Sequence, residues 1–310
     1  MLRYSLRRIA YAVPLVLGVA TLAFFMIHLV PGNPARTVLG PQASAAAVAA
    51  LDHRFGLDEP VAAQYLHFLT RGVRLNFGTS LDYNVSVNSL IVSRFLPTAL
   101  LIAYGMVLAV LLAVPLAIVA AVHRDRAADH AVRLSGMVTF VMPPFWLGLI
   151  LALVFGLQLG ILPTSGYGRG PGNVLRSLTL PAVTLGLILA PLILRTLRAA
   201  LIETLSSDFV QAARARGFTE RRVLYRHALR NSLISTLTVI GVSVSFLIGG
   251  SVLVENVFNL PGLGQLLVTA VAARDYPVIQ GLIVVMGTGV VLVNLLTDLS
   301  YALVDPRVRL

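Results

Sequence analysis

The chain has 310 residues, of which 57% are hydrophobic and 12% charged, and its mean hydropathy is +0.86. This is far too much apolar surface for a soluble domain, so the composition indicates an integral membrane protein. All 24 basic residues are arginine, and the chain contains neither lysine nor cysteine. These absences exclude thiol chemistry, disulfides and thiolate metal sites, and they exclude a P-loop, whose lysine neutralises the phosphates of a nucleotide.

The hydropathy pattern predicts an all-α membrane protein with six transmembrane helices. A helix needs about 20 apolar residues to cross a bilayer. Three arginines precede the first apolar segment, but that segment is longer than the apolar region of a signal peptide, and the following Pro-Gly-Asn-Pro is no cleavage site. We therefore expect an uncleaved signal anchor there. The six segments are 9–30, 98–122, 134–157, 178–194, 231–254 and 276–303.

The arginines are distributed unevenly between the two sides of the membrane. With both termini inside, 16 of the 24 lie in cytoplasmic segments, and only eight lie in the longer outside segments. This asymmetry predicts that both termini are cytoplasmic. It also explains the net charge of +11 without nucleic acid, which we exclude as a partner.

The chain order suggests three parts. Residues 1–30 form an N-terminal cytoplasmic segment and the first transmembrane helix, 31–97 a long extracytoplasmic loop, and 98–310 a five-helix core with a cytoplasmic loop at about 195–230. In the long loop we expect helices at 45–55 and 60–70, and an amphipathic stretch with Val87, Leu90, Ile91 and Phe95 on one face. This loop is either a lid over the bundle or a platform for an external protein.

Several residues inside the spans suggest local features. Pro115, Pro143-Pro144 and Pro191 predict kinks. Small residues spaced by four in the fifth span, Gly241, Ser245 and Gly249, predict close helix packing, either within this chain or against a second membrane subunit.

One carboxylate, Asp298, lies within the sixth span. Charges in the apolar layer are costly unless paired, so we expect a structural ion pair of Asp298 with Arg195 or, alternatively, Arg198. A proton relay is less favoured because no further carboxylates continue it. The six histidines are scattered without ligand spacing, and we predict neither a metal site nor a catalytic site.

The loop at 195–230 carries a short predicted helix. Asp208 is the expected N-cap, Gln211 completes a capping-box-like pair, and Gly217 ends the helix in a left-handed conformation. A helix of about two turns is marginal alone, so a partner, or the chain's own bundle, must hold it. The predicted contact face is Phe209, Ala212, Ala213 and Arg216.

A turn-rich segment, Pro261-Gly262-Leu263-Gly264, follows the fifth span on the outside. Together with Asn256 and Phe258 it is predicted to help close an outer gate or to contact a delivery protein. The alternative is a plain connecting loop.

Gln211-Ala212-Ala213, followed after three residues by Gly217, resembles the EAA loop of ABC importer permeases, with glutamine in place of the usual glutamate. Further sequence strings, in order from one end of the chain to the other, resemble the dipeptide/oligopeptide permease family. The resemblance is to the first of the two permease subunits in that family. The strings are residues 1–35, FGTSL at 77–81, PPFWLGL at 143–149, DFVQAARARG at 208–217, HALRNSL at 227–233, VENVFNLPGLG at 254–264, ARDYPVIQG at 273–281 and DPRVR at 305–309.

The resemblance implies a type I ABC importer architecture in a bacterial cytoplasmic membrane. It implies a heterodimer with a second related permease, one or two ABC ATPase subunits that bind ATP and magnesium, and an extracytoplasmic binding protein or lipoprotein. This chain itself would hold no cofactor and would not be an enzyme, and residues 208–217 would be its coupling helix to an ATPase. The implied substrates are dipeptides or oligopeptides; a nickel complex, glutathione or haem are alternatives, and a secondary transporter is a more distant one.

Overall fold

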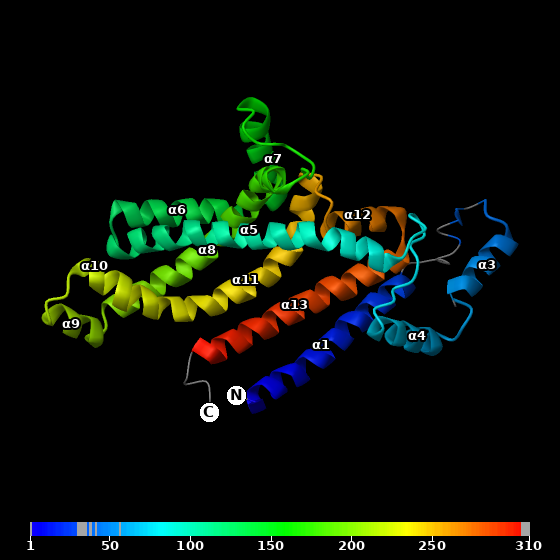
Figure 1. The fold of residues 1–310 in the computed structure, drawn as a ribbon, viewed down its shortest axis with the longest axis horizontal. Coiled ribbons are helices and arrows are strands. Elements are labelled where there is room, and N and C mark those ends of the chain that lie inside the picture. Colours follow the sequence, from blue (N-terminus) through cyan, green and yellow to red (C-terminus); the bar gives the residue numbers. More distant parts are fainter. Residues whose placement is uncertain (1, 30–35, 37–38, 41, 56, 305–310) are drawn as a thin grey trace.

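The computed structural model describes residues 2–29, 36, 39–40, 42–55 and 57–304. Five long helices run lengthwise through the molecule (Figure 1): α1 (Leu2–Leu29), α5 (Val87–Val122), α8 (Pro171–Leu205), α11 (Arg230–Val257) and α13 (Tyr276–Val304). Among the described residues these are the helices long and apolar enough to cross a membrane singly, and one bent helix pair makes a sixth span if it is counted as one. The expected all-α fold is confirmed.

The third predicted span is the bent one. It consists of α6 (Ala127–Val141) and α7 (Pro144–Leu151), which continues as the π-helix η1 (Ala152–Gln158), and the two parts meet at 105°. The break lies at Pro143-Pro144, where two successive prolines remove backbone donors. Figure 1 shows α7 projecting sideways from the bundle. Pro115 and Pro191, in contrast, lie inside the uninterrupted helices α5 and α8.

The core is centred on the pair α5 and α8, which pack through small residues. Ala109, Ala113 and Ala117 repeat every fourth residue along α5 and are completely buried. At the outer end of this seam, a side chain on Gly186 would lie 3.2 Å from the backbone oxygen of Gly105. Close backbone approach through small residues is the usual way in which membrane helices associate.

The long outer loop forms two short helices, as expected, α3 (Ala45–Phe55) and α4 (Val61–Val73). Pro60 lies at the N-cap of α4, one position before the predicted one. The Tyr65 hydroxyl of α4 lies 2.7 Å from the Thr21 hydroxyl of α1, and its ring lies 5.3 Å from that of Phe24. The amphipathic stretch at 87–95 is the beginning of α5 rather than a separate element, so that helix continues across the expected limit between loop and core.

The two ends of the bundle carry different short helices (Figure 1). One end carries α9 (Asp208–Ala215) and α10 (Glu220–Arg222), near the start of α1 and the end of α13. The other end carries α3, α4 and α12 (Leu263–Ala273). The predicted coupling segment and the predicted outer gate are therefore on opposite sides of the bundle.

Candidate functional site

The predicted coupling segment forms a helix within the expected limits, but its start differs in detail. Ser207 occupies the N-cap, and Asp208 is the first helical residue, so the predicted capping role of Asp208 is wrong. The Gln211 amide donates a hydrogen bond to the Ser206 carbonyl oxygen at 3.3 Å instead of closing a capping box. Gly217 has φ of +79° and its N–H donates to Arg214 O at 2.9 Å, which confirms the left-handed ending.

One side of α9 packs against its own chain. Val210 and Ala213 are buried and form a small cluster with Val223 and Phe218. Ala213 therefore does not belong to the predicted contact face, because it lies close to the next helical segment and not in the open. The exposed part of that face consists of Phe209, which is 47% exposed, and Ala212, Arg216 and the neighbouring Gln211.

A single arginine ties α9 to both flanking helices. The Arg214 guanidinium donates to the Glu220 carboxylate at 2.9 and 3.2 Å, and to the backbone oxygen of Leu205 at 3.3 Å. Leu205 ends α8 and Glu220 begins α10, so this side chain spans the loop. The segment after α10, η2 (Val223–Leu229), is π-helical and leads directly into α11.

An aromatic contact supports the same loop. The Phe218 ring stacks on His227 with centroids 5.6 Å apart, and the Arg222 guanidinium lies 4.5 Å from the Phe218 centroid. The Ser232 hydroxyl donates to the Thr204 hydroxyl oxygen at 3.1 Å and joins α11 to the end of α8. The chain's own bundle therefore holds the face of α9 that contains Val210 and Ala213. The opposite face of α9 is exposed.

The residues predicted for an outer gate or a binding-protein contact are mostly not accessible. Phe258, Gly262, Leu263 and Gly264 are buried, and Pro261 is half-buried. Asn256 is exposed, and its amide donates to the carbonyl oxygen of Val252 at 2.7 Å. Direct contact of the four buried residues with an external protein is thus excluded in this conformation.

This turn is buried because it surrounds Glu255, a residue to which the sequence analysis gave no role. Its carboxylate lies at the N-terminus of α12 and accepts hydrogen bonds from the Thr98 hydroxyl at 2.7 Å and from the N–H groups of Gly264 and Gln265 at 2.7 and 3.0 Å. A side chain on Gly262 would overlap this carboxylate, which explains the glycine. The available signal was the spacing of an acidic residue before a glycine-rich helix start, since helix N-termini attract carboxylates.

A second buried carboxylate, Asp275, joins two of the strings that carry the resemblance. It accepts hydrogen bonds from the Ser80 hydroxyl and from the backbone N–H groups of Leu81 at 3.1 Å and Asp82 at 3.2 Å. It also caps α13 through Val278 N–H at 3.4 Å. The FGTSL and ARDYP strings are thus in direct contact, although almost 200 residues separate them in sequence.

The predicted ion pair between Arg195 and Asp298 is wrong. Asp298 instead pairs with Arg8 at 2.6 Å, because α13 packs beside α1 and not beside α8. Arg198, the alternative partner, binds Asp129 with two hydrogen bonds of 2.7 and 2.5 Å, because α6 packs beside α8. Asp129 is completely buried.

The small residues of the fifth span, for which packing within the chain and against a second permease were both open, lie largely inside this chain. A side chain on Gly241 would overlap Thr297, and the Ser245 hydroxyl donates to Asn294 Oδ1 at 3.3 Å. Both partners are on α13, so these two residues pack within the chain, which is the first of the two possibilities. Gly249 has no heavy atom within 4 Å of a built side chain and is the only one of the three with open space.

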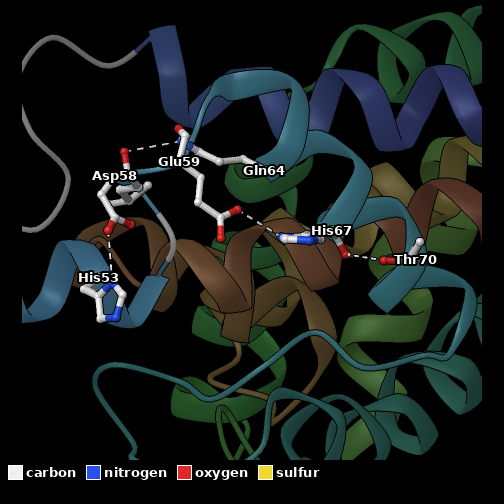
Figure 2. A network of polar contacts seen from close by, with 7 residues as sticks. His53, Asp58, Glu59, Gln64, His67 and Thr70 are labelled. Carbon is white, nitrogen blue, oxygen red and sulfur yellow. Dashed lines mark hydrogen bonds and ion pairs between the residues drawn. The ribbon is translucent and has the colours of Figure 1, made fainter.

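The outer loop carries exposed polar contacts (Figure 2). His53 Nδ1 lies 2.9 Å from Asp58 Oδ2, and His67 Nδ1 lies 3.1 Å from Glu59 Oε2. The hydrogen bond to Asp58 raises the pKa of His53 above its ordinary value of 6.5, and the same bond lowers the pKa of Asp58. Gln64 joins this network by donating to the Glu59 carbonyl oxygen at 2.8 Å. The contacts link the end of α3 to α4.

Two family models together match almost the whole chain. The model described as "Binding-protein-dependent transport system inner membrane component" matches residues 113–310, and the corresponding N-terminal model matches residues 1–103. The chain is 40% identical to the glutathione transport system permease protein GsiC of Salmonella choleraesuis (strain SC-B67) and 38% identical to that of Escherichia coli (strain K12). Each comparison covers 100% of this chain and 99% of the relative.

Solved structures share the fold. The chain resembles a subunit of the inward-facing MetNI methionine ABC transporter, with a TM-score of 0.60 and 19% identity over 70% of this chain and 96% of that one. It also resembles a subunit of an amino acid ABC transporter, with a TM-score of 0.51 and 15% identity over 71% of this chain and 94% of that one. At these identities the likeness concerns the fold alone.

Proposed function

This chain belongs to the family of binding-protein-dependent transport system inner membrane components, and from that premise we propose that it imports short peptides, glutathione among them, by coupling to ATPase subunits through α9. It is the multi-pass permease component of an ABC importer of the bacterial inner membrane. A second related permease, one or two ABC ATPases that bind ATP and magnesium, and an extracytoplasmic binding protein or lipoprotein complete the proposed importer.

The arrangement of α9 carries the proposal. Its inner side is fixed by Val210 and Ala213, and Arg214 ties it to α8 and α10, while Phe209 and Ala212 are open on the other side. Because α9 is fixed to long transmembrane helices, a movement of α9 moves those helices as well. An exposed aromatic side chain next to small residues fits a hydrophobic groove on a partner protein. Both properties are required for a coupling helix.

A pair of adjacent substitutions tests this role. Phe209→Ala removes an exposed ring, so we expect unchanged stability and a loss of substrate uptake in proteoliposomes that contain the whole importer. Val210→Ala removes two buried methyl groups and should lower the stability of the loop by about 1.5 kcal/mol. Normal uptake by Phe209→Ala, with stimulated ATP hydrolysis still linked to transport, would contradict the assignment.

Steric variants provide a stronger form of the test. Gly217→Pro cannot adopt φ of +79°, and Ala212→Trp fills the open face, so each should uncouple ATP hydrolysis from uptake while the chain still inserts. Ala127→Trp, at an exposed alanine that begins α6, is the matched control and should transport normally. Vanadate-sensitive uptake without dependence on a proton gradient would separate this function from a secondary transporter.

The substrate class rests on the relatives. Glutathione is itself a tripeptide, so the relatives named for glutathione transport and the resemblance to dipeptide and oligopeptide permeases point to one chemical class. Cells that lack their own glutathione and dipeptide importers and express the complete importer should accumulate labelled glutathione. Accumulation of a dipeptide without glutathione would narrow the substrate class to ordinary peptides, whereas uptake of neither would refute it.

A further inference from the structure

A cavity of about 420 Å³ lies between α6 and α8, apart from the coupling loop and from the buried carboxylates of the outer end. Its lining combines two features that rarely occur together on a membrane helix. Its polar part consists of Arg133, Arg195, Arg198 and His130, and the apolar side chains of Met137, Phe140 and Leu192 are among those that line the rest. Gly136 of α6 and Pro191 of α8 also line the cavity, and a Cβ atom on Gly136 would lie 3.6 Å from the Cβ atom of Pro191.

The charge at the basic end is not balanced by the protein. The carboxylate on the same helix as Arg133, Asp129, already accepts two hydrogen bonds from Arg198. Arg133 acts on Asp129 only through longer-range attraction. In the part of the chain that the structure describes, neither Arg133 nor Arg195 makes a hydrogen bond or a close ion pair. The cavity therefore has an excess of two positive charges at its mouth.

The position of the cavity along the spans restricts the chemistry of an occupant. Arg133 is one residue before the expected third span and Arg195 one residue after the fourth, and these antiparallel helices place both at the same membrane surface. Met137 and Phe140 lie about one and two turns deeper along α6. Met137 is 69% exposed, and Phe140 is 61% exposed. An occupant needs an anionic group at headgroup depth and an apolar chain below it.

We propose that this cavity binds an anionic phospholipid of the cytoplasmic leaflet, with its phosphodiester between Arg133 and Arg195 and an acyl chain along Met137 and Phe140. The assignment rests on the membrane orientation that belongs to the proposed function. Basic pockets between transmembrane helices on the cytoplasmic side suit such headgroups, and that leaflet concentrates anionic lipid. A free phosphate would gain nothing from the apolar wall, so the lipid is the source of the anion.

The complete importer, purified and transferred into lipid of defined composition, can test the site by native mass spectrometry. The probe is dioleoyl phosphatidylglycerol in a dioleoyl phosphatidylcholine background. Each arginine near the membrane surface contributes about fivefold in affinity, so Arg133→Gln combined with Arg195→Gln should reduce the affinity for phosphatidylglycerol roughly 30-fold. Arg124→Gln combined with Arg126→Gln removes two arginines from the same side of the bundle but outside the cavity, and should retain the lipid.

Three results would overturn the proposal. Equal retention by the cavity variant and the wild type would show that the arginines do not hold the lipid. Equal loss in the control variant would show non-specific attraction to the whole basic surface. Displacement of the bound anion by millimolar inorganic phosphate would identify a free-anion site. Retention does not depend on transport, so an importer that fails to take up glutathione but keeps the lipid would contradict the proposed substrate and leave the lipid site intact.

Photolabelling of the wild-type importer is a second test, and it does not depend on the folding or assembly of a variant. Phosphatidylglycerol with a photoreactive group in its acyl chain, added to the wild-type importer, should label the peptide that contains Met137 and Phe140. Excess unlabelled phosphatidylglycerol should suppress this labelling, and excess phosphatidylcholine should not. Labelling spread evenly over the helices, or equal suppression by both lipids, would refute the site.

Discussion

Two short helices, α9 at one end of the bundle and α12 at the other, are anchored by different kinds of contact. The start of α12 is saturated by a buried carboxylate, Glu255, and four of its residues, Leu263, Gly264, Leu266 and Ala270, are buried. In α9 only Val210 and Ala213 are buried, and the tie to its neighbours is the exposed ion pair of Arg214 with Glu220.

The difference separates a structural helix from one with a free surface. The buried carboxylate of Glu255 accepts three hydrogen bonds from within the chain, and these bonds fix α12 to α5 and α11. An exposed pair in high dielectric contributes little and can adjust. The end with α12 therefore has its polar groups at this turn paired within the chain, and the end with α9 has an exposed surface that a partner can bury.

The largest expected effect is at Glu255. Glu255→Ala removes the acceptor of the buried Gly264 N–H, of the partly buried Gln265 N–H and of the shorter hydrogen bond of the Thr98 hydroxyl, so we expect a loss of roughly 3 to 6 kcal/mol of stability. Glu255→Gln keeps an acceptor oxygen and should lose less. The thermal unfolding midpoint of the purified importer measures both, and Glu203→Ala, an exposed acid at the end of α8, should change it little. Equal thermal unfolding midpoints for Glu255→Ala and Glu203→Ala would contradict the proposed difference between the anchoring of α12 and that of α9.

A smaller effect is expected at Asp275. Asp275→Ala removes the acceptor for the Ser80 hydroxyl, for the partly buried N–H groups of Leu81 and Asp82, and for the long hydrogen bond from Val278 N–H, so we expect a loss of about 2 to 4 kcal/mol. The result should be local: amide hydrogen exchange at 80–82 should accelerate while α9 remains as in the wild type. Asp275→Asn retains one oxygen and is the matched control. Acceleration throughout the chain would mean that the outer end does not form a separate anchored unit.

At the other end the corresponding change should be mild. Arg214→Gln removes an exposed ion pair and one hydrogen bond to Leu205 O, with an expected loss of about 1 kcal/mol. Faster hydrogen exchange confined to α9 is the expected sign. Glu220→Gln should reproduce the part that comes from the ion pair, and a double-mutant cycle isolates it. A loss as large as that of Glu255→Ala would contradict the contrast between the two ends.

Local patterns predicted the fold and α9 well because their causes are local. Apolar runs define the long helices, and Gly217 ends α9 since its left-handed conformation depends on that residue alone. Even the bend in the third span follows from two adjacent prolines. The N-cap moved by one residue because Ser207 and Asp208 are both good capping residues.

Contacts between distant segments could not be predicted in this way. The partner of Asp298 depends on whether α13 packs beside α1 or α8, and a single sequence does not contain that information. Likewise, the helix face that contains Gly241 and Ser245 can pack against a helix of this chain or against a helix of a second subunit, and the sequence does not distinguish the two. Phe258 and Leu263 were expected at the surface because turn residues usually are, but Glu255 and Thr98 draw that turn into the core.

The smallest expected effect is the titration of the outer loop. His53 and Asp58 are both exposed, so their contact has little influence on overall stability. The pKa of His53 is raised above 6.5 and that of Asp58 is lowered, so the contact is fully formed only between the ordinary pKa values of the two groups, from about pH 4 to pH 6.5. It should be lost as the pH rises through the raised pKa of His53, and again as the pH falls through the lowered pKa of Asp58. NMR of histidine-labelled importer, with His53→Gln for assignment, can follow this titration. Asp58→Asn should bring the pKa of His53 down toward 6.5, because it removes both the charge and the stronger acceptor. An unchanged titration of His53 in Asp58→Asn would show that the link between α3 and α4 does not form in the membrane.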